Sequence, residues 1–166
     1  MYRTINDFTE DWRRETASTA KIYRALTDAS LAQKVTPDGR SLGFLAWHII
    51  VSVCDAARRS GLKSKLPTRN DPMPVSASAL AEVYIASTKV VGDEIGEHWN
   101  DASLLEEVEM FGEKWRRGFA LSAMMRHQTH HRGQMTVLMR QAALTVPGVC
   151  GPAKEEWATM GMPALQ

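Results

Sequence analysis

The sequence predicts an all-α protein that folds as a single-domain four-helix bundle. Three observations lead to this fold class. Apolar side chains recur at helical spacing in four separate segments, and turn-forming residues separate those segments. The length of 166 residues is that of one domain with a sizeable core. Each amphipathic helix must bury its apolar stripe against its neighbours, and four helices do so by forming a bundle.

The first two helices have clear start signals. Thr4 and Asp7 resemble a capping box that opens a first helix, whose apolar positions run from Ile5 to Leu26. Residues 37–40 (Pro-Asp-Gly-Arg) have turn chemistry, and Ser41 is a suitable N-cap for a second helix. We expect that helix to end near residues 60–61, where a glycine supplies the stop.

The last two helices follow a loop and an irregular segment. Residues 63–74 contain three prolines and predict a surface loop, after which Ser76 or Ser78 begins a third helix. Residues 100–114 are less regular, and they fit a short hairpin or a loop equally well. The fourth helix is predicted from about Trp115 to Ala143.

A C-terminal tail, residues 146–166, follows the fourth helix within the same domain of residues 1–166. Prolines and glycines break regular structure at its start. The rest of the tail either docks on the bundle through Trp157, Met160 and Met162 or stays mobile.

Composition limits which binding partners and which cellular compartment we expect for this chain. The formal net charge is +1, with charges of both signs spread along the chain, which gives no electrostatic footprint for nucleic acid. The longest apolar stretch, residues 42–57, is interrupted by polar residues and predicts a buried helix, so we expect no membrane association. Cys54 and Cys150 form no Cys-x-x-Cys unit and suggest no disulfide framework, which fits a cytoplasmic protein.

The most informative motif is the pair His127 and His131 on the predicted fourth helix. A spacing of four places both imidazoles on one helix face, which is a suitable arrangement for two nitrogen ligands of a divalent metal. We expect this face to point into the core, because within about 60° of His127 on the helical wheel lie Ala120, Met124, Gln134, Leu138 and Ala142. His130 lies about 80° from the midpoint of the pair, at the flank of the helix, although a His127/His130 pair remains an alternative.

Two familiar metal mechanisms fit the sequence poorly. Gln128 stands where the helical zinc-peptidase motif has its general-base glutamate. A di-iron carboxylate bundle needs a glutamate three residues before a histidine on two helices, and none of the five histidines has one. A mononuclear site rich in histidine remains, and its structural alternative is a solvated or hydrogen-bonded histidine pair.

A metal needs at least a third ligand. His48 lies in the apolar second helix and is either a core histidine or the third ligand beside the pair. His98 lies at a helix end, where its charge would interact favourably with the helix dipole, and we expect no metal role for it. Ser52 and Asp55 share the face of His48. Either residue could contact a metal ligand or the substrate; the alternative is that Ser52 packs between helices and Asp55 is solvated.

Two further residues follow the motif. Gln134 shares the face of the pair and is a candidate for a hydrogen bond near the site. Arg132 points away from the pair, which favours a structural salt bridge or an inter-subunit contact.

These motifs together resemble the DinB/YfiT-like family. The resemblance rests on Trp47-His48, on His127-x-x-x-His131-Arg-Gly-Gln134, and on the tail segment 148–157, and it covers nearly the whole chain. It implies a four-helix bundle in which His48, His127 and His131 hold one divalent metal ion. It also implies a homodimer, and use of the metal to activate a low-molecular-weight thiol such as mycothiol or bacillithiol.

The functional expectation is therefore a metal-dependent enzyme. It would catalyse group transfer to, or hydrolysis of, a small electrophile, using a low-molecular-weight thiol or a water molecule that the metal activates. The alternative is a non-catalytic metal-binding stress-response protein. We expect zinc or nickel, with iron or copper as alternatives, although imidazole ligands by themselves do not select the metal. No catalytic residue is assigned, and the candidates beside the ligands are Ser52, Asp55 and Gln134.

Overall fold

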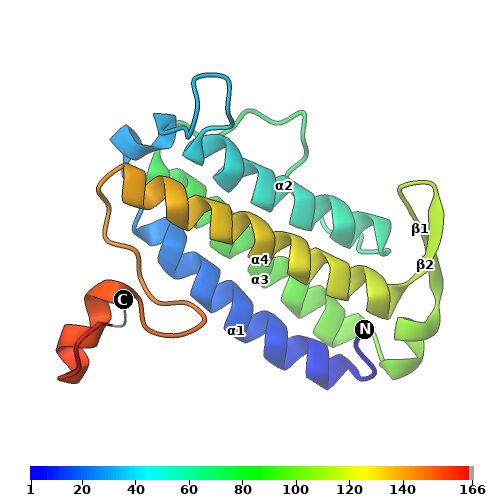
Figure 1. The fold of residues 1–166 in the computed structure, drawn as a ribbon. Coiled ribbons are helices and arrows are strands. Elements are labelled where there is room, and N and C mark those ends of the chain that lie inside the picture. Colours follow the sequence, from blue (N-terminus) through cyan, green and yellow to red (C-terminus); the bar gives the residue numbers. More distant parts are fainter. Residues whose placement is uncertain (165–166) are drawn as a thin grey trace.

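The computed structural model describes residues 1–164 and consists mainly of four long helices (Figure 1). The long helices are α1 (Ile5–Arg24), α2 (Leu42–Arg59), α3 (Ala77–His98) and α4 (Arg117–Gln141). Three short 3-10 helices and one two-stranded hairpin complete it: η1 (Asp28–Ala32), η2 (Asp101–Leu105), β1 (Glu107–Met110), β2 (Glu113–Arg116) and η3 (Lys154–Met160). The predicted all-α four-helix bundle is confirmed.

The first three long helices begin where the sequence predicts. The Thr4 hydroxyl accepts a hydrogen bond from the Asp7 backbone N–H at 3.0 Å. Ser41 caps α2 in the same way, and Ser76, rather than Ser78, caps α3. Each hydroxyl satisfies one of the amide groups that a helix leaves unpaired in its first turn.

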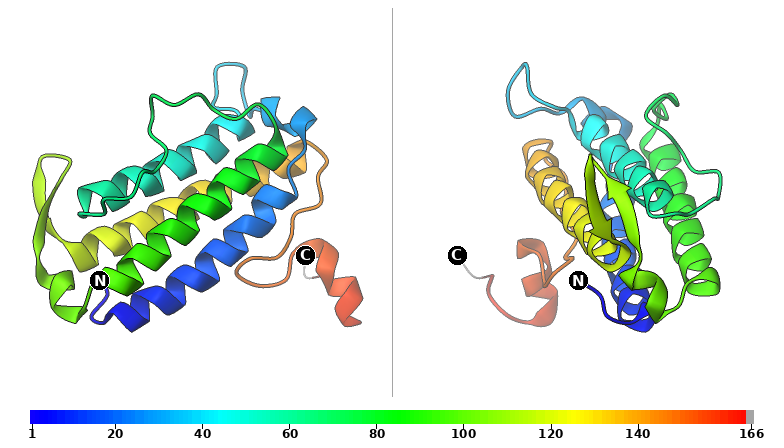
Figure 2. Two further views of the ribbon diagram at one scale, coloured as in Figure 1. Left: turned by 180° about the vertical axis from the view of Figure 1, so that it is seen from behind. Right: turned by 90° about the vertical axis from the view of Figure 1, so that its right-hand side faces the viewer.

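The helices pack as two adjacent pairs. α1 lies along α3, and α2 lies along α4, with α2 also against α3 and α1 against α4 (Figures 1 and 2). The hairpin closes one end of the bundle beside the start of α4 and the end of α2. Within residues 1–164, none of the helices combines the length and apolarity that a bilayer crossing requires.

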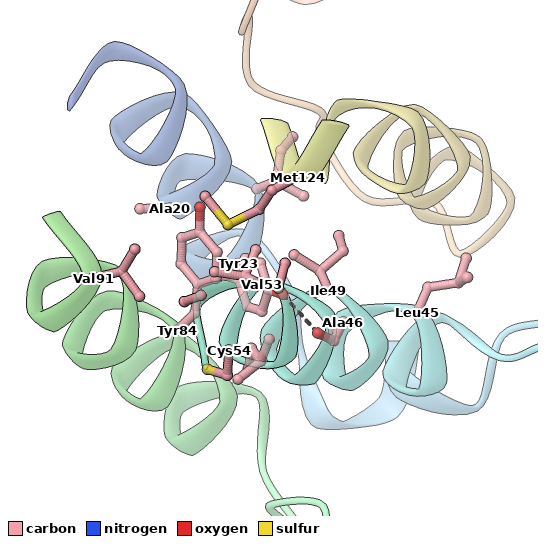
Figure 3. Packing of buried hydrophobic residues seen from close by; sticks show 14 of the residues in the cluster. Ala20, Tyr23, Leu45, Ala46, Ile49, Val53, Cys54, Tyr84, Val91 and Met124 are labelled. Carbon is pink, nitrogen blue, oxygen red and sulfur yellow. Dashed lines mark hydrogen bonds between the residues drawn. The ribbon is translucent and has the colours of Figure 1, made fainter. Parts of the chain in front are cut away.

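Two tyrosines occupy the centre of the bundle, where side chains of all four helices meet (Figure 3). The rings of Tyr23 and Tyr84 stack with centroids 4.3 Å apart. The Tyr23 hydroxyl donates to the Ala46 carbonyl at 2.6 Å, and the Tyr84 hydroxyl donates to the Gln128 side-chain oxygen at 2.9 Å. The hydrogen bonds satisfy buried hydroxyls that would otherwise lose their water partners at a cost in stability. Gln128, where a zinc peptidase has its base, is therefore part of the core.

The irregular segment before α4 contains a hairpin, which shortens the predicted fourth helix. β1 and β2 pair antiparallel, with Val108 opposite Trp115. The turn residues Phe111 and Gly112 have φ of 55° and 86°, the positive values that a tight two-residue hairpin turn requires. The prediction that α4 begins near Trp115 was wrong by two residues, because Trp115 and Arg116 extend the second strand.

The C-terminal tail packs on the bundle through Val146 and Val149 at its start, and polar contacts hold the part that follows. Arg140 of α4 forms an ion pair with Glu155, and the Glu156 carboxylate accepts from the backbone N–H of Gly148 and Ala153, each at 2.9 Å. Met160 is 53% exposed and Met162 is also exposed, so these two methionines do not dock, whereas Trp157 is half-buried. η3 stands away from the four long helices (Figure 2).

Candidate metal centre

The structure brings His48, His127 and His131 together at the seam between α2 and α4. His48 lies near the start of α2, and the other two lie on adjacent turns in the middle of α4. One nitrogen from each imidazole falls within a group whose atoms all lie within 4.8 Å of one another. The ring centroids of His48 lie 5.1 Å from His127 and 4.6 Å from His131. Residues far apart in the sequence thus form one cluster.

The spacing of the α4 pair suits a shared metal ion. The Nε2 atoms of His127 and His131 are 3.2 Å apart. Two imidazole nitrogens that bind one tetrahedral ion at about 2.1 Å lie about 3.4 Å from each other. A hydrogen bond between two neutral imidazoles also spans this distance, so the other contacts of the rings are needed to decide between the two.

Gln134 determines which nitrogen of His131 is available. The Gln134 side-chain oxygen lies 2.7 Å from His131 Nδ1. An amide oxygen only accepts, so Nδ1 carries the proton and Nε2 presents its lone pair toward His127 and His48. Such a hydrogen bond is the usual way in which a protein orients a metal-ligating histidine. The sequence-based prediction of a hydrogen bond from Gln134 near the site is confirmed.

All three imidazoles are held in the neutral form that metal binding requires. Burial lowers the pKa of His48 to about 4, with smaller contributions from the imidazoles of His131 and His127. Burial is also the main reason why the pKa values of His127 and His131 lie below the ordinary value. Protons therefore compete weakly for these nitrogens near neutral pH.

The cluster lies where the α2–α4 contact reaches the protein surface, and not in the core. His131 is 6% exposed, whereas His48 is half-buried and His127 is exposed. The prediction that the α4 pair points into the core was therefore wrong for His127. The helical wheel placed the pair beside apolar residues, but it could not show that α2 covers that face of α4 only in part. Partial exposure leaves room for a molecule to reach the cluster.

The remaining histidines stay outside the cluster. His130 lies at the flank of α4, with Nε2 3.3 Å from the Gln134 side-chain nitrogen. Among residues 1–164, His130 is not part of the histidine group whose nitrogens lie close enough to hold a metal ion, so a His127/His130 pair is not favoured. His98 is the last residue of α3, as predicted for a residue without a metal role.

The donor set fits a divalent ion. Three neutral imidazoles converge, and the group contains no carboxylate or thiolate. Three protein ligands leave one tetrahedral position open, which is typical of catalytic zinc sites and not of structural ones. Imidazole ligation suits zinc, nickel, copper and iron alike, so the ligands do not choose among them.

The candidates beside the ligands have different roles. The Ser52 hydroxyl lies 3.4 Å from His48 Nε2 and 3.5 Å from Nδ1, one turn further along α2. Asp55 does not reach the imidazoles by any hydrogen bond in residues 1–164 and instead accepts from Arg58 at 3.4 Å and from Arg59 at 3.0 Å. Asp55 is thus a partner of two arginines.

A cavity of about 260 Å³ opens directly beside the cluster. Its polar lining residues are His48, Ser52, Asp55, Arg69 and His127. Its apolar lining comes mainly from Met110, Phe111, Trp115 and Met124. Sequence reasoning missed Arg69 and the three hairpin residues. The Phe-Gly pair at residues 111–112 was the only hint of a turn there, and the proline-rich loop gave no sign that it returns to α2.

Arg132 follows His131 but faces the opposite seam. Its guanidinium is 2% exposed and pairs with the Glu15 carboxylate of α1 at 2.6 Å. It also donates to the Thr19 hydroxyl at 2.9 Å. The predicted structural salt bridge is confirmed as a contact within the chain.

Fold and site define this chain as a helical bundle with a three-histidine cluster open to a small cavity. Comparison with known proteins gives the family. The sequence matches the DinB family over residues 1–164. The chain belongs to the DinB family, which confirms the resemblance seen in the sequence.

Relatives agree over almost the entire length. The chain is 39% identical to the uncharacterized protein YrdA of Bacillus subtilis (strain 168), covering 99% of this chain and 98% of that protein. It superposes on the crystal structure of a DinB-like protein from Bacillus cereus ATCC 10987 with a TM-score of 0.86 and 41% identity, over 90% of this chain and 99% of the other. The DinB-like protein YjoA of Bacillus subtilis shares the fold at a TM-score of 0.67 and 16% identity, over 86% and 97% of the two chains.

Proposed function

We propose that this protein is a metal-dependent enzyme that binds one divalent ion through His48, His127 and His131. In this proposal it catalyses group transfer to, or hydrolysis of, a small electrophile, using a small thiol or a water molecule that the ion activates. The observation that carries the proposal is the convergence of three neutral imidazoles, with nitrogens within 4.8 Å, at the wall of a cavity. A histidine cluster with a purely structural role has no need of an adjacent cavity.

The residues of the chain prepare the site. The Gln134 side-chain oxygen accepts a hydrogen bond from His131 Nδ1–H and leaves Nε2 free to bind. Burial keeps His48 neutral, and Ser52 lies against its ring. A divalent ion bound there would keep one position open and would act as a Lewis acid, lowering the pKa of a coordinated water or thiol. The cavity beside His48 and His127 is the place where a substrate would be oriented.

Metal analysis of the purified protein tests the ligand set. We expect about one divalent ion per chain in the wild type and a sharp loss in His48→Ala, His127→Ala and His131→Ala. His98→Ala is the matched control, because His98 lies at the end of α3 and outside the cluster. Circular dichroism reports whether each variant keeps its helices. Stoichiometric metal in a folded His127→Ala protein would contradict the ligand set.

A thiol-transfer assay separates the enzyme from the alternative of a non-catalytic metal-binding stress-response protein. The metal-loaded, chelated and His131→Ala proteins are compared with a panel of low-molecular-weight thiols and a small electrophile. The enzyme proposal expects turnover that disappears on chelation, returns with metal, and rises with pH as the attacking group is deprotonated. Firm metal binding without turnover for any thiol favours the stress-response protein.

We also propose that the chain forms a homodimer through two long helices. Supporting this, Phe44 of α2 and Val137 of α4 are exposed apolar residues, 43% and 54% respectively, on helices that pack side by side. Sedimentation should give a dimer, and Val137→Glu should weaken it, because a charge there would have to be desolvated. Val75→Glu, in an exposed loop, is the control. A wild type that is monomeric across micromolar concentrations contradicts the dimer.

A further inference from the structure

The cavity beside the histidine cluster has one apolar wall and one cationic residue. Met110, Phe111 and Trp115 of the hairpin form the apolar wall, together with Met124 of α4. Arg69, in the loop between α2 and α3, lines the same cavity as His48 and His127. A binding site of this composition orients a ligand by burying its apolar part and pairing its charged part.

Asp55 holds both sides of the cavity in place. Its carboxylate binds Arg58 and Arg59 one turn further along α2. Arg58 donates to the Pro67 carbonyl at 3.0 Å and so fastens the loop that carries Arg69. The Arg59 guanidinium lies over the Phe111 ring at 5.3 Å from its centroid, a cation–π contact that fastens the hairpin tip. Asp55 is therefore a positioning residue for the cavity.

The aromatic wall is fixed by contacts of its own. The Trp115 indole N–H donates to the Glu113 carboxylate at 2.8 Å. Its ring meets the edge of Phe119 at a centroid distance of 4.9 Å and that of Phe111 at 6.0 Å. Phe111 nevertheless remains 64% exposed although it lines the cavity. A ligand that covers this ring would bury apolar surface that the chain leaves in water.

Arg69 is a cation without a protein partner among residues 1–164. No ion pair or side-chain hydrogen bond engages its guanidinium there. The turn that carries it is held by Asp71, whose carboxylate accepts from the Thr68 backbone N–H at 2.7 Å and from its hydroxyl at 3.0 Å. Asp55, the one carboxylate that lines the cavity among the described residues, is already paired with two arginines. The surroundings of the cavity therefore carry a net positive charge.

We infer that the cavity binds a substrate that combines a flat apolar group with a carboxylate, the carboxylate pairing with Arg69 and the apolar group packing on Phe111 and Trp115. The inference rests on the proposed function, since the cavity is a substrate site only if the cluster acts on what it holds. The size is suitable: a cavity of about 150 Å³ accommodates benzene, and this one measures about 260 Å³. A guanidinium and a carboxylate can also pair through two parallel hydrogen bonds.

Titration calorimetry with phenylacetate, its neutral analogue phenylacetamide, and acetate tests this inference. We expect the zinc-loaded wild type to prefer phenylacetate, and Arg69→Gln to weaken phenylacetate binding about tenfold without changing phenylacetamide binding. Arg14→Gln is the matched control, because Arg14 is an exposed arginine of α1 remote from the cavity lining. A wild type that binds the two phenyl compounds equally, or an Arg69→Gln protein with unchanged phenylacetate affinity, overturns the inference.

A carboxylate could instead bind the metal, and His131→Ala distinguishes the two. His131 is a member of the cluster but does not line the cavity, so its removal should eliminate the metal and leave the lining intact. We expect phenylacetate affinity in His131→Ala to stay within about threefold of wild type and to fall again when Arg69→Gln is added. Loss of binding in His131→Ala alone would assign the carboxylate to the metal and overturn the role of Arg69. If the wild type holds no metal, the proposed function fails, and the Arg69 comparison still reports on the cavity.

The apolar wall is tested separately. Phe111→Asn should weaken both phenyl compounds and leave acetate unchanged, because it removes the ring and its contacts with Arg59 and Trp115 but keeps Arg69 and the Arg58–Pro67 hydrogen bond. Asparagine is chosen because it tolerates the φ of 55° at this position. Equal affinity of Phe111→Asn and wild type for phenylacetate would contradict the packing part of the inference.

Discussion

The two seams of α4 use adjacent polar residues in opposite ways. On the seam with α1, Arg132 is buried and satisfied by Glu15 and Thr19. On the seam with α2, His131 has one nitrogen satisfied by Gln134 and the other facing two further imidazoles. The first arrangement leaves no capacity for a ligand, whereas the second keeps lone pairs free beside a cavity. Complete hydrogen bonding marks a structural role, and incomplete bonding at an accessible place marks a binding role.

The largest expected effect is the loss of the α1–α4 ion pair. Arg132→Met should lower the free energy of unfolding by about 3–5 kcal/mol, because it leaves the Glu15 carboxylate partly buried without its partner. Urea denaturation measures this. Metal content per folded chain should stay at the wild-type level, since Arg132 does not face the cluster. The double variant with Glu15→Gln should recover part of the stability; a single variant as stable as wild type would show that the pair is dispensable.

The second effect concerns the α2–α4 seam in the presence of metal. Saturating zinc should stabilise the wild type by about 2.7 kcal/mol at a free concentration one hundred times the dissociation constant. His131→Ala should lose this gain, because a ligand is missing, while the metal-free variant should unfold close to metal-free wild type. Thermal unfolding with and without zinc makes the comparison. A zinc shift in His131→Ala as large as in wild type contradicts the prediction.

The third effect tests the orienting hydrogen bond. Gln134→Ala should weaken metal affinity about 10–100-fold without abolishing it, because His131 loses the acceptor that fixes its Nδ1 proton. Competition with a chromogenic chelator gives the affinity. Thr136→Ala is the control, since Thr136 is also on α4 but hydrogen-bonds only the Gly133 carbonyl among the described residues. Unchanged affinity in Gln134→Ala would remove Gln134 from the site.

The smallest effect is a pH dependence of the metal-free protein. The pKa of His48 is lowered from 6.5 to about 4, so in this window the unfolded chain binds a proton that the folded chain does not. Stability should therefore be complete above pH 6.5 and should fall toward pH 4, by about 1 kcal/mol after allowance for solvent screening. The difference between wild type and His48→Gln isolates this contribution. Parallel pH profiles for the two proteins would rule it out.

The sequence predicts local features of this fold better than it predicts how surfaces meet. Thr4, Ser41 and Ser76 gave helix starts because capping depends on residues within one turn. The start of α4 was misplaced because Trp115 suits both strand and helix, and pairing with Val108 decides the matter.

The histidine ligand candidates were found because spacing on one helix encodes a shared face. Their exposure was misjudged, since it depends on how far α2 extends over α4. Arg69 was missed because its place beside His48 results from the Arg58–Pro67 hydrogen bond, a contact between a helix and a loop that no local pattern reveals. The cytoplasmic location, the thiol and the metal stay predictions.

The direct junction between β2 and α4 has a consequence for how related proteins can diversify. β2 ends at Arg116 and α4 begins at Arg117, so the aromatic wall and the helix that carries His127 and His131 form one continuous stretch of chain. The two-residue hairpin tip at Phe111 and Gly112 nevertheless lies outside α4 and contains none of the histidines. Exchanging or lengthening that tip would reshape what the cavity accepts while the nitrogen donors keep their positions. Specificity and reactivity can therefore evolve by separate mutations in this scaffold, and a graft of the hairpin tip between relatives would carry substrate preference with it.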